Sequence, residues 1–295
     1  MGCCNTKGQR YAFQGPSDLL APLRESFAVH NPEMCVVLIR VKEMKRLVAG
    51  NHLGNDTDPY VELSVVSSAP GGSDPQKQRS SMKINTRNPR WFPPERFQFK
   101  INGLHSSKIV MNVYHFLPIL KPVPIGDAVL HLKEFDVGDQ RKNQSFMLTH
   151  EADGTQEGSI VVSIEVMTAQ QAANTQEHYI YEFHRWNGEW GTLECFLLTD
   201  PGRWSTLDGQ EFGNDIDTIA PAIPTGWEVV RDWATGVTDS DPDGWEYSTD
   251  MRSNYWHPTG DAITQCIRRR VWSRKVAKVV SGVWWDSAFS DPNNQ

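Results

Sequence analysis

The residues with the clearest chemical consequence stand at the start of the chain. Met1 is followed by Gly2, Cys3 and Cys4, with Thr6 a few positions further on, which is the pattern of N-myristoylation at Gly2 once Met1 is removed. One myristoyl chain binds a membrane only marginally, and a second acyl chain on a neighbouring cysteine makes the attachment stable. We therefore expect lipidation at Gly2, Cys3 and Cys4. The alternative is an unmodified, disordered leader.

Aspartates are the next residues to weigh, because Ca²⁺ prefers several oxygen ligands, carboxylates above all. The run Asp239-Ser240-Asp241-Pro242-Asp243-Gly244 resembles the first half of an EF-hand loop. Pro242 stiffens this run, and Asp250 stands where such a loop has glutamate, so we expect a solvated acidic turn. We predict no metal site. The carboxylates that come nearest to one are Asp56, Asp58, Asp239, Asp241 and Asp243.

Other chemical signals are missing from the sequence. It contains no nucleophile elbow, no phosphate-binding glycine loop and no His/Cys metal spacing, so we expect neither catalytic residues nor a cofactor. Its cysteines are sparse and odd in number, which is typical of a reducing compartment. No apolar stretch approaches the ~20 residues that span a bilayer, and the N-terminus lacks the apolar region of a secretory signal.

Charge is distributed unevenly along the chain. The net charge is −7, so no overall basic balance points to nucleic acid. Residues 77–100 hold seven Lys/Arg against one Glu, whereas residues 196–250 hold twelve acids against two arginines. Such segments predict separate surfaces with separate partners: a basic strip over 77–100 for membrane lipid, and an acidic surface over 200–250 for a protein.

Residues 34–168 form a series of short β-type runs separated by turn residues. Several runs alternate, as Phe97, Phe99 and Ile101 do with Gln98 and Lys100. Since no long helical segment intervenes, we predict an all-β fold that begins with an antiparallel eight-stranded β-sandwich. The runs cover residues 35–41, 59–66, 78–84, 95–101, 108–116, 125–132, 144–149 and 159–166.

The same segment resembles the C2 domain family. A full strand at 159–166, with no strand before residue 35, is similar to the family's type II strand order. The motifs that carry the resemblance are Gly54-Asn55-Asp56-Thr57-Asp58-Pro59-Tyr60-Val61, Asn88-Pro89-Arg90-Trp91, Phe97-Gln98-Phe99 and Ile125-Gly126-Asp127-Ala128. The resemblance implies a β-sandwich that binds lipid.

The resemblance also bears on calcium. Many C2 domains bind Ca²⁺ through a cluster of aspartates on two loops, and of that set only Asp58 is present here. The other positions fall on His52, His115, Leu117 and Val123. Since imidazole and aliphatic groups do not replace carboxylates as ligands of a hard cation, we expect no Ca²⁺ at the family's usual place.

Two features of this segment favour contact with lipid. The third loop, residues 116–124, is apolar at its tip and ends near Lys121, which suits insertion at the headgroup boundary. The alternative is packing against the second domain or against residues 19–23. The basic strip adds about 1 kcal/mol per cationic side chain at an anionic phospholipid or phosphoinositide surface, unless it is an ordinary solvated face. We predict the lipid-binding residues Lys77, Arg79, Lys83, Arg87, Phe116, Leu117, Ile119 and Leu120.

Ten of the eleven tryptophans lie between residues 186 and 285, a density typical of a small core built from large rings. Residues 178–276 resemble the dysferlin domain, a family that includes dysferlin, peroxisomal peroxins and tectonin-repeat proteins. The matching motifs are Tyr181-Glu182-Phe183-His184-Arg185-Trp186, Gly188-Glu189-Trp190, Asp200-Pro201-Gly202-Arg203-Trp204, Pro224-Thr225-Gly226-Trp227-Glu228, Asp232-Trp233, Asp243-Gly244-Trp245-Glu246-Tyr247 and Arg268-Arg269-Arg270-Val271-Trp272-Ser273-Arg274. The resemblance implies a β-rich domain held by stacked Arg and Trp side chains.

Such stacking gives the basic run at 268–270 a structural interpretation. Guanidinium groups stack favourably on indole rings. On an alternating strand Arg268 and Arg270 share a face with Trp272, while Arg269 faces the opposite way. We therefore expect these arginines to hold the fold rather than to bind nucleic acid or lipid phosphate. The expected stacks involve Arg185, Trp186, Trp190, Arg203, Trp204, Trp227, Trp245, Arg268, Arg270 and Trp272.

The sequence thus predicts an acylated leader (1–33), a C2 domain (34–168), a polar linker (169–177), a dysferlin domain (178–276) and a tail (277–295). We expect a peripheral membrane adaptor without enzymatic activity, which binds anionic lipid without calcium and acts in membrane organisation, trafficking or repair. Its place would be the cytoplasmic face of the plasma membrane or of an endomembrane. The alternatives are a protein-interaction scaffold held by its acyl chains only, and a calcium-dependent membrane-docking sensor.

Overall fold

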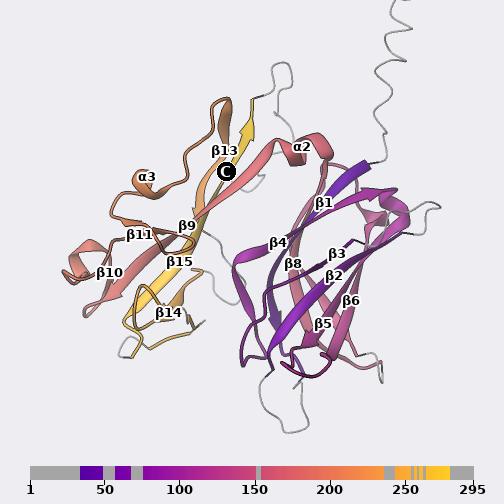
Figure 1. The fold of residues 1–295 in the computed structure, drawn as a ribbon, viewed down its shortest axis with the longest axis horizontal. Helices are drawn as coiled ribbons and strands as arrows, with labels where there is room; N and C mark the ends of the chain where they lie inside the picture. Colours follow the sequence, from indigo (N-terminus) through magenta and orange to yellow (C-terminus); the bar gives the residue numbers. More distant parts are fainter. Residues whose placement is uncertain are drawn as a thin grey trace, which may run out of the picture.

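The structure, a computed structural model, describes residues 34–48, 57–67, 76–150, 154–235, 243–253, 256–257, 259–261 and 264–279. Within these residues no helix is long and apolar enough to cross a bilayer. Figure 1 shows two β units beside each other, a first unit with β1–β8 and a second with β9–β15. Outside the described residues lie the predicted acylation sites and three of the candidate carboxylates: Gly2, Cys3, Cys4, Asp56, Asp239 and Asp241.

The first unit is an eight-stranded antiparallel sandwich, as predicted. Hydrogen bonds join its strands in the order β3-β2-β5-β6-β7-β8-β1-β4. Among the described residues β6 and β7 share a single registered pair, so the path divides there into two layers of four strands. The strands are β1 (Met34–Lys45), β2 (Pro59–Ser67), β3 (Lys77–Arg79), β4 (Arg90–Asn102), β5 (Ser107–His115), β6 (Val123–His131), β7 (Gln140–Thr149) and β8 (Gln156–Thr168), with short 3-10 turns η1 (Leu104–Ser106) and η2 (Leu132–Glu134).

Alternating side chains build the core between these layers. On β4, Phe97, Phe99 and Ile101 are buried, whereas Gln98 and Lys100 are exposed, because successive side chains of a strand point to opposite faces. The apolar faces of the other strands complete one continuous cluster. The outward face of β4 therefore presents polar groups, and its cations remain available to a partner.

β8 departs from this alternation because it is buried on both faces. Ile160, Val162 and Ile164 belong to the core of the first unit, while Glu165 and Met167, on the other face, are also buried. A strand that reads as a continuous buried run needs cover on both sides. The second unit and the short helix before it supply that cover.

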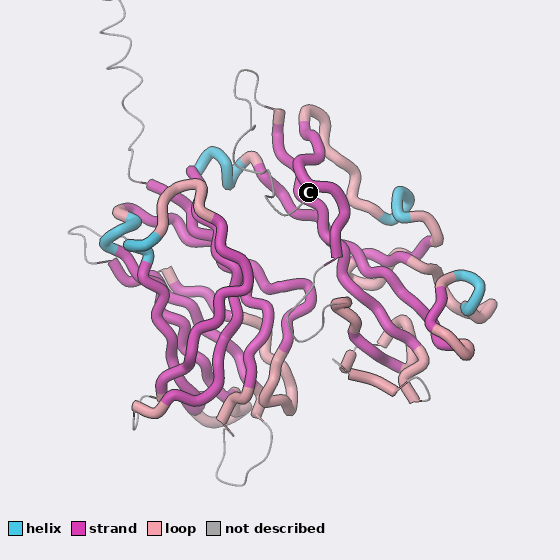
Figure 2. Tube along the Cα trace, turned by 180° about the vertical axis from the view of Figure 1, so that it is seen from behind, coloured by secondary structure: helices cyan, strands magenta, loops and turns pink. Residues whose placement is uncertain are grey.

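The second unit is a smaller antiparallel sheet in the order β12-β11-β9-β15-β13, with β10 paired to β9 and β14 to β15. Large side chains fill its core, among them Tyr181, Phe183 and Ile267. Figure 2 shows that strands dominate both units, which confirms the all-β prediction. The elements are β9 (Thr175–Trp186), β10 (Trp190–Gly191), η3 (Leu193–Cys195), β11 (Trp204–Thr206), β12 (Phe212–Gly213), α3 (Ile216–Ile219), β13 (Trp227–Thr235), β14 (Glu246–Ser248) and β15 (Ile267–Lys278).

The predicted polar linker over 169–177 is folded. Thr168 and Gln171 form a capping box that begins α2 (Ala169–Ala173), and Ala172 is buried against the outer face of β1. β9 starts directly afterwards. β15 also extends two residues past the predicted domain end at 276. The two units are therefore joined by ordered structure.

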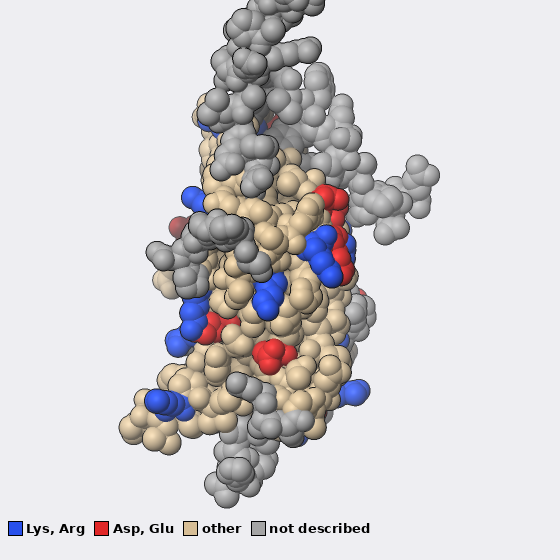
Figure 3. Space-filling view, turned by 90° about the vertical axis from the view of Figure 1, so that its right-hand side faces the viewer, with Lys and Arg blue, Asp and Glu red and all other residues tan. Residues whose placement is uncertain are grey.

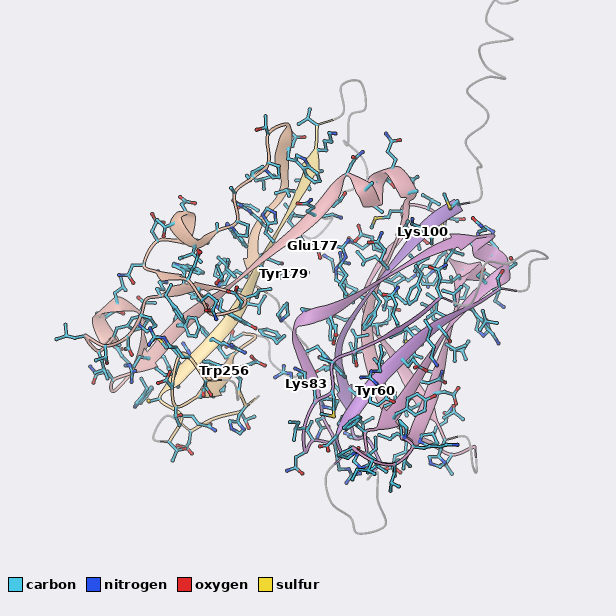
Figure 4. All side chains as sticks on the ribbon, in the orientation of Figure 1. Tyr60, Lys83, Lys100, Glu177, Tyr179 and Trp256 are labelled. Atoms are coloured by element: carbon cyan, nitrogen blue, oxygen red, sulfur yellow. The ribbon has the colours of Figure 1, made fainter. Side chains whose placement is uncertain are left out.

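A buried charge network fixes this junction. Arg40 of β1 donates to Glu177 of β9 at 2.7 Å and to Glu165 of β8 at 3.0 Å. Lys275 of β15 donates to the other oxygen of Glu165 at 2.6 Å. The Tyr179 hydroxyl donates to Glu177 at 2.6 Å, and Figure 4 shows both residues on β9. Two cations and two carboxylates thus balance across the junction.

Candidate membrane-binding site

The third loop connects β5 to β6 and presents an uncovered apolar tip. Ile119 is 95% exposed and Leu120 is 70% exposed, and the neighbouring Lys121 is exposed as well. Phe116 and Leu117 are half-buried, and the Phe116 amide donates to the Asp58 carbonyl at 2.9 Å. The base of the loop is thus anchored while its tip packs against neither β unit, which excludes the expected alternative of packing on the second domain.

Asp58, the aspartate at a calcium-ligand position of the C2 resemblance, interacts with groups of the neighbouring loops. Its carboxylate accepts the Asn85 amide at 2.7 Å. Its own amide donates to Nδ1 of the buried His115 at 3.0 Å. Among the described residues no three His, Cys, Asp or Glu side chains gather as a metal site would require. Independence from calcium stays a prediction.

The basic strip does not form one surface. Lys77 pairs with Glu62 at 2.6 Å, a contact that raises the pKa of the lysine, and Arg79 lies 4.8 Å from the Tyr60 ring centroid. Both side chains are exposed on β3. The Gln78 side chain donates to the carbonyl of residue 98 at 2.7 Å, which holds β3 beside β4. The exposed cation Lys100 therefore continues the patch onto β4, whereas Arg96 lies beside Arg40 of β1, on the side of the second unit.

Two of the predicted lipid-binding residues lie elsewhere. Lys83 lines a cavity between the two β units, opposite Glu246 and Trp256, and its burial lowers its pKa. Arg87 donates to the Leu47 carbonyl at 2.5 Å. Both side chains thus lie away from the β3–β4 surface, and their contact with lipid stays a prediction.

We define the β3–β4 patch as Lys77, Arg79 and Lys100, three exposed cations of the two strands that lie side by side at this edge of the sandwich. Figure 3 shows the side of the first unit away from the second unit, where cations and acids are scattered and separated by neutral surface. Exposed cations on neighbouring strands favour binding to an anionic surface.

The predicted Arg/Trp stacks are largely present in the second unit. Arg268 lies 4.0 Å from the Trp245 ring centroid and 4.7 Å from that of Trp190. Arg270 lies 4.6 Å from Trp245 and 5.1 Å from Trp272. Arg203 also stacks on Trp204, at 5.0 Å, and Trp186 packs on Trp190. Arg185 instead pairs with Asp200, and Trp227 has no arginine partner among the described residues.

Arg269 faces the opposite side of β15, as the alternation predicts. Its guanidinium lies 4.0 Å from the ring centroids of both Tyr181 and Trp256, and it pairs with Glu246 at 3.2 Å. All three arginines of the basic run are thus occupied inside the unit. This leaves them little freedom to contact nucleic acid or lipid phosphate.

Glu182 is a central residue that sequence reasoning missed. Its side chain is 0% exposed and accepts hydrogen bonds from Arg203 and Arg270 at 2.6 Å each and from Trp272 at 2.9 Å. Burial alone would raise its pKa, but the hydrogen bonds from His184, Arg203 and Arg270 outweigh burial and lower the pKa. The available signal was a carboxylate inside the short apolar run over residues 179–183 of β9.

Comparison with known proteins supports the first unit's assignment. The family model for the C2 domain matches residues 35–148. The chain is 33% identical over 113 residues to tectonin beta-propeller repeat-containing protein 1 of Rattus norvegicus, and 32% identical over 120 residues to a tectonin beta-propeller repeat-containing protein of Drosophila melanogaster. These matches cover 37% and 40% of this chain and 9% of each relative, so the chain spans about a tenth of the relatives' length.

A solved structure similar to this chain is a C2 domain of plant Extended Synaptotagmin 1. The similarity has a TM-score of 0.38 at 21% identity and covers 45% of this chain and 94% of that one. Human GIVD cytosolic phospholipase A2 is similar over 84% of this chain and 33% of its own, with a TM-score of 0.38 at 15% identity.

Proposed function

We propose that this chain, whose residues 35–148 form a C2 domain, is a doubly acylated peripheral membrane adaptor without enzymatic activity. It binds anionic lipid without calcium and acts in membrane organisation, trafficking or repair on the cytoplasmic face of the plasma membrane or an endomembrane. The exposed third-loop tip, Ile119 and Leu120, carries the proposal. Apolar side chains left in water are costly, and a lipid surface is the partner that relieves this cost.

Three further observations support the proposal. The β3–β4 patch supplies the cations that attract an anionic bilayer. Asp58 is engaged by Asn85, and His115 stands at a position where calcium-binding relatives have a carboxylate. Stacked arginines and tryptophans support a dysferlin-type second unit, and tectonin proteins are among the relatives found. Gly2, Cys3 and Cys4 remain the proposed sites of acylation.

The proposal is tested on the full chain with Gly2→Ala, which prevents myristoylation. We expect this protein to sediment with anionic liposomes, with chelator as well as with Ca²⁺, and to leave neutral liposomes unbound. Sedimentation only with Ca²⁺ would support the docking sensor instead. No sedimentation under any condition would leave the acyl chains as the attachment and support the scaffold.

Removing the apolar loop tip gives the first specific prediction. Ile119→Ser/Leu120→Ser is expected to weaken liposome affinity by about ten-fold or more, because burying one such side chain contributes more than the ~1.4 kcal/mol that corresponds to ten-fold. Liposome titration measures the change. The matched control is Val66→Ser/Val137→Ser, two exposed residues outside the loop. An equal loss in both variants would mean that the third loop has no special contact with lipid.

Neutralising the β3–β4 patch gives the second prediction. Arg79→Gln/Lys100→Gln is expected to lower affinity for anionic liposomes by about 30-fold, because each of the two cations contributes about 1 kcal/mol, and to flatten the dependence of this affinity on salt. The control Lys108→Gln/Lys133→Gln removes the same charge from β5 and from η2. If the control loses as much affinity, net charge rather than this patch determines binding.

The scaffold alternative also has support from the second unit. Leu197 and Leu198 are exposed beside η3, and Asp208, Glu211 and Asp217 are exposed within the predicted acidic surface. Others of its acids are internal, since Asp200 pairs with Arg185. A protein partner on this surface is compatible with lipid binding through the first unit.

A further inference from the structure

The cavity that Lys83 lines has a volume of about 320 Å³ and lies between the two β units. The loop after β3 and the start of β4 form its wall on the first unit, and residues of β14 and β15 form part of its wall on the second. Figure 4 shows Lys83 at the side of the first unit that faces Trp256. The volume falls within the range of small-ligand sites, so a ligand in this cavity contacts both units.

Lys83 is a cation of this cavity without a close counter-charge. Among the described residues no carboxylate oxygen lies within 4.0 Å of its ammonium group, although Glu246 and Glu95 attract it from a greater distance. Burial outweighs this attraction and lowers the pKa of Lys83, which means that the surroundings favour the neutral form. An anion in the cavity would stabilise the charged form, so Lys83 favours an anionic ligand.

The other charged groups of the lining are paired. Both hydrogen bonds from Arg269 to Glu246, at 3.2 Å each, end on the same carboxylate oxygen. Arg90 lies 3.5 Å from a carboxylate oxygen of the buried Glu43. Each pair is neutral, so the lining has one positive charge in excess, that of Lys83. A single excess charge matches a phosphodiester, which carries one negative charge, better than it matches a polyphosphate.

Two polar groups of the lining remain able to bind a headgroup. The Thr86 hydroxyl oxygen accepts the Asn88 amide at 3.0 Å, and its proton has no acceptor among the described residues. The second Glu246 oxygen accepts no hydrogen bond from the described part of the chain. A hydroxyl group can accept from Thr86 and donate to Glu246. The lining therefore favours a headgroup that carries hydroxyl groups beside the phosphodiester.

The position of the cavity connects it to the proposed membrane surface. The Lys83 amide donates to the Pro59 carbonyl at 3.0 Å. The Phe116 amide, at the base of the third loop, donates to the adjacent Asp58 carbonyl at 2.9 Å. The cavity is thus at the same end of the sandwich as the third loop. Ile84 lines the cavity and is 65% exposed, and with the loop tip in a bilayer we expect this rim near the headgroup layer.

We propose that this cavity binds one anionic phospholipid, with its phosphodiester paired to Lys83 and a hydroxyl-bearing headgroup, as in phosphatidylglycerol or phosphatidylinositol, between the two units. The inference rests on the proposed membrane function and deepens it. The apolar rim at Ile84 contacts the first carbons of the acyl chains, which a free headgroup lacks. The site is distinct from the β3–β4 patch, because it needs residues of both units.

The test uses the full chain with Gly2→Ala and dihexanoyl phosphatidylglycerol below the concentration at which it forms micelles, so that no bilayer takes part. Lysines are acetylated with acetic anhydride, and the modified peptides are quantified by mass spectrometry. We expect the lipid to protect Lys83 and to leave Lys108 and Lys133 unchanged. We also expect dihexanoyl phosphatidylcholine, whose headgroup has no net charge, and glycerophosphoglycerol, which lacks acyl chains, to protect Lys83 much less.

Two variants of Lys83 separate the contribution of its charge from that of its shape. Calorimetric titration with the same lipid is expected to give an affinity at least about five-fold lower for Lys83→Gln, which corresponds to ~1 kcal/mol. Lys83→Arg keeps the charge and is expected to bind nearly as the parent does. Lys133→Gln, which removes an exposed lysine of η2, is the matched control. Protection of Lys83 in the parent protein decides the question if a variant unfolds, as thermal denaturation would reveal.

Unchanged acetylation of Lys83 with the lipid, or equal affinities of Lys83→Gln and Lys133→Gln, would overturn the inference. Equal protection by glycerophosphoglycerol would assign the cavity to a free phosphodiester and would also overturn it. Failure of the proposed membrane function gives a different result. If the protein does not sediment with phosphatidylglycerol vesicles but the dihexanoyl lipid protects Lys83, the inference stands and the membrane function fails. Sedimentation with these vesicles without protection of Lys83 overturns the inference alone.

Discussion

Replacing Glu182 by glutamine is expected to destabilise the second unit by about 3–5 kcal/mol, the usual cost of removing one partner from a buried ion pair. The substitution keeps the shape of the side chain and removes its charge. Arg203 and Arg270 donate to this carboxylate at 2.6 Å each, and both would then lack their buried counter-charge. Because arginine stays protonated even when it is buried, the unpaired charges lower the free energy of unfolding of the second unit.

Urea unfolding followed by tryptophan fluorescence measures this effect, because ten of the eleven tryptophans lie at or beyond residue 186. Glu211→Gln is the matched control, since Glu211 is exposed in the same unit, and we expect it to change stability by less than ~0.5 kcal/mol. Equal midpoints for the two variants would show that the arginine stacks hold the unit without Glu182.

Acidification is expected to weaken the junction between the units. Burial raises the pKa of Glu177, but Arg40 and the Tyr179 hydroxyl outweigh burial and lower the pKa from 4.5 to about 2. The same balance, with Lys275 and Arg40, lowers the pKa of Glu165. A folded-state pKa below the unfolded one stabilises the fold above the unfolded value, and this stabilisation is lost as the pH falls through the folded value. For Glu177 the shift corresponds to on the order of 3 kcal/mol, lost between about pH 5 and pH 2.

Glu177→Gln tests this linkage. The variant is expected to unfold at a lower temperature than the parent near neutral pH, and the difference is expected to shrink steadily below pH 5 as Glu177 of the parent becomes protonated. Thermal denaturation at a series of pH values measures it. Glu228→Gln removes an exposed carboxylate from β13 and is expected to follow the parent at every pH. A constant difference between Glu177→Gln and the parent would contradict the lowered pKa.

The ordered junction has a consequence for the proposed membrane function. α2 and β9 follow β8 directly, and the Tyr181 hydroxyl donates to the Phe92 carbonyl at 2.9 Å, 89 residues away along the chain. A flexible linker would let the second unit sample many orientations over a bilayer. The packed junction instead holds the second unit in one orientation relative to the third loop.

Periodicity along single strands was readable from the sequence. The inward Phe97 and Phe99 of β4 and the opposite facings of Arg268 and Arg269 follow from the two-residue repeat of a β-strand. The exposure of the third loop was also predictable from the sequence. Ile119 lies outside every alternating run, so no strand would bury it, and its side chain is exposed in the structure. These features depend on neighbouring residues only.

The charge network at the junction, the position of Lys83 and the folding of residues 169–177 depend on contacts between strands that are distant in the sequence. Arg40 and Glu177 are 137 residues apart, and Lys275 and Glu165 are 110 apart, so neither pairing leaves a pattern in a local window of sequence. For the same reason the sequence assigns Lys83 to a continuous basic strip, whereas in the structure Lys83 faces the second unit. Residues 169–177 have the composition of a polar linker, but Ala172 is buried against β1. A charged side chain shows its type in the sequence, but whether it meets lipid, a counter-charge or a ring depends on which strands fold beside it.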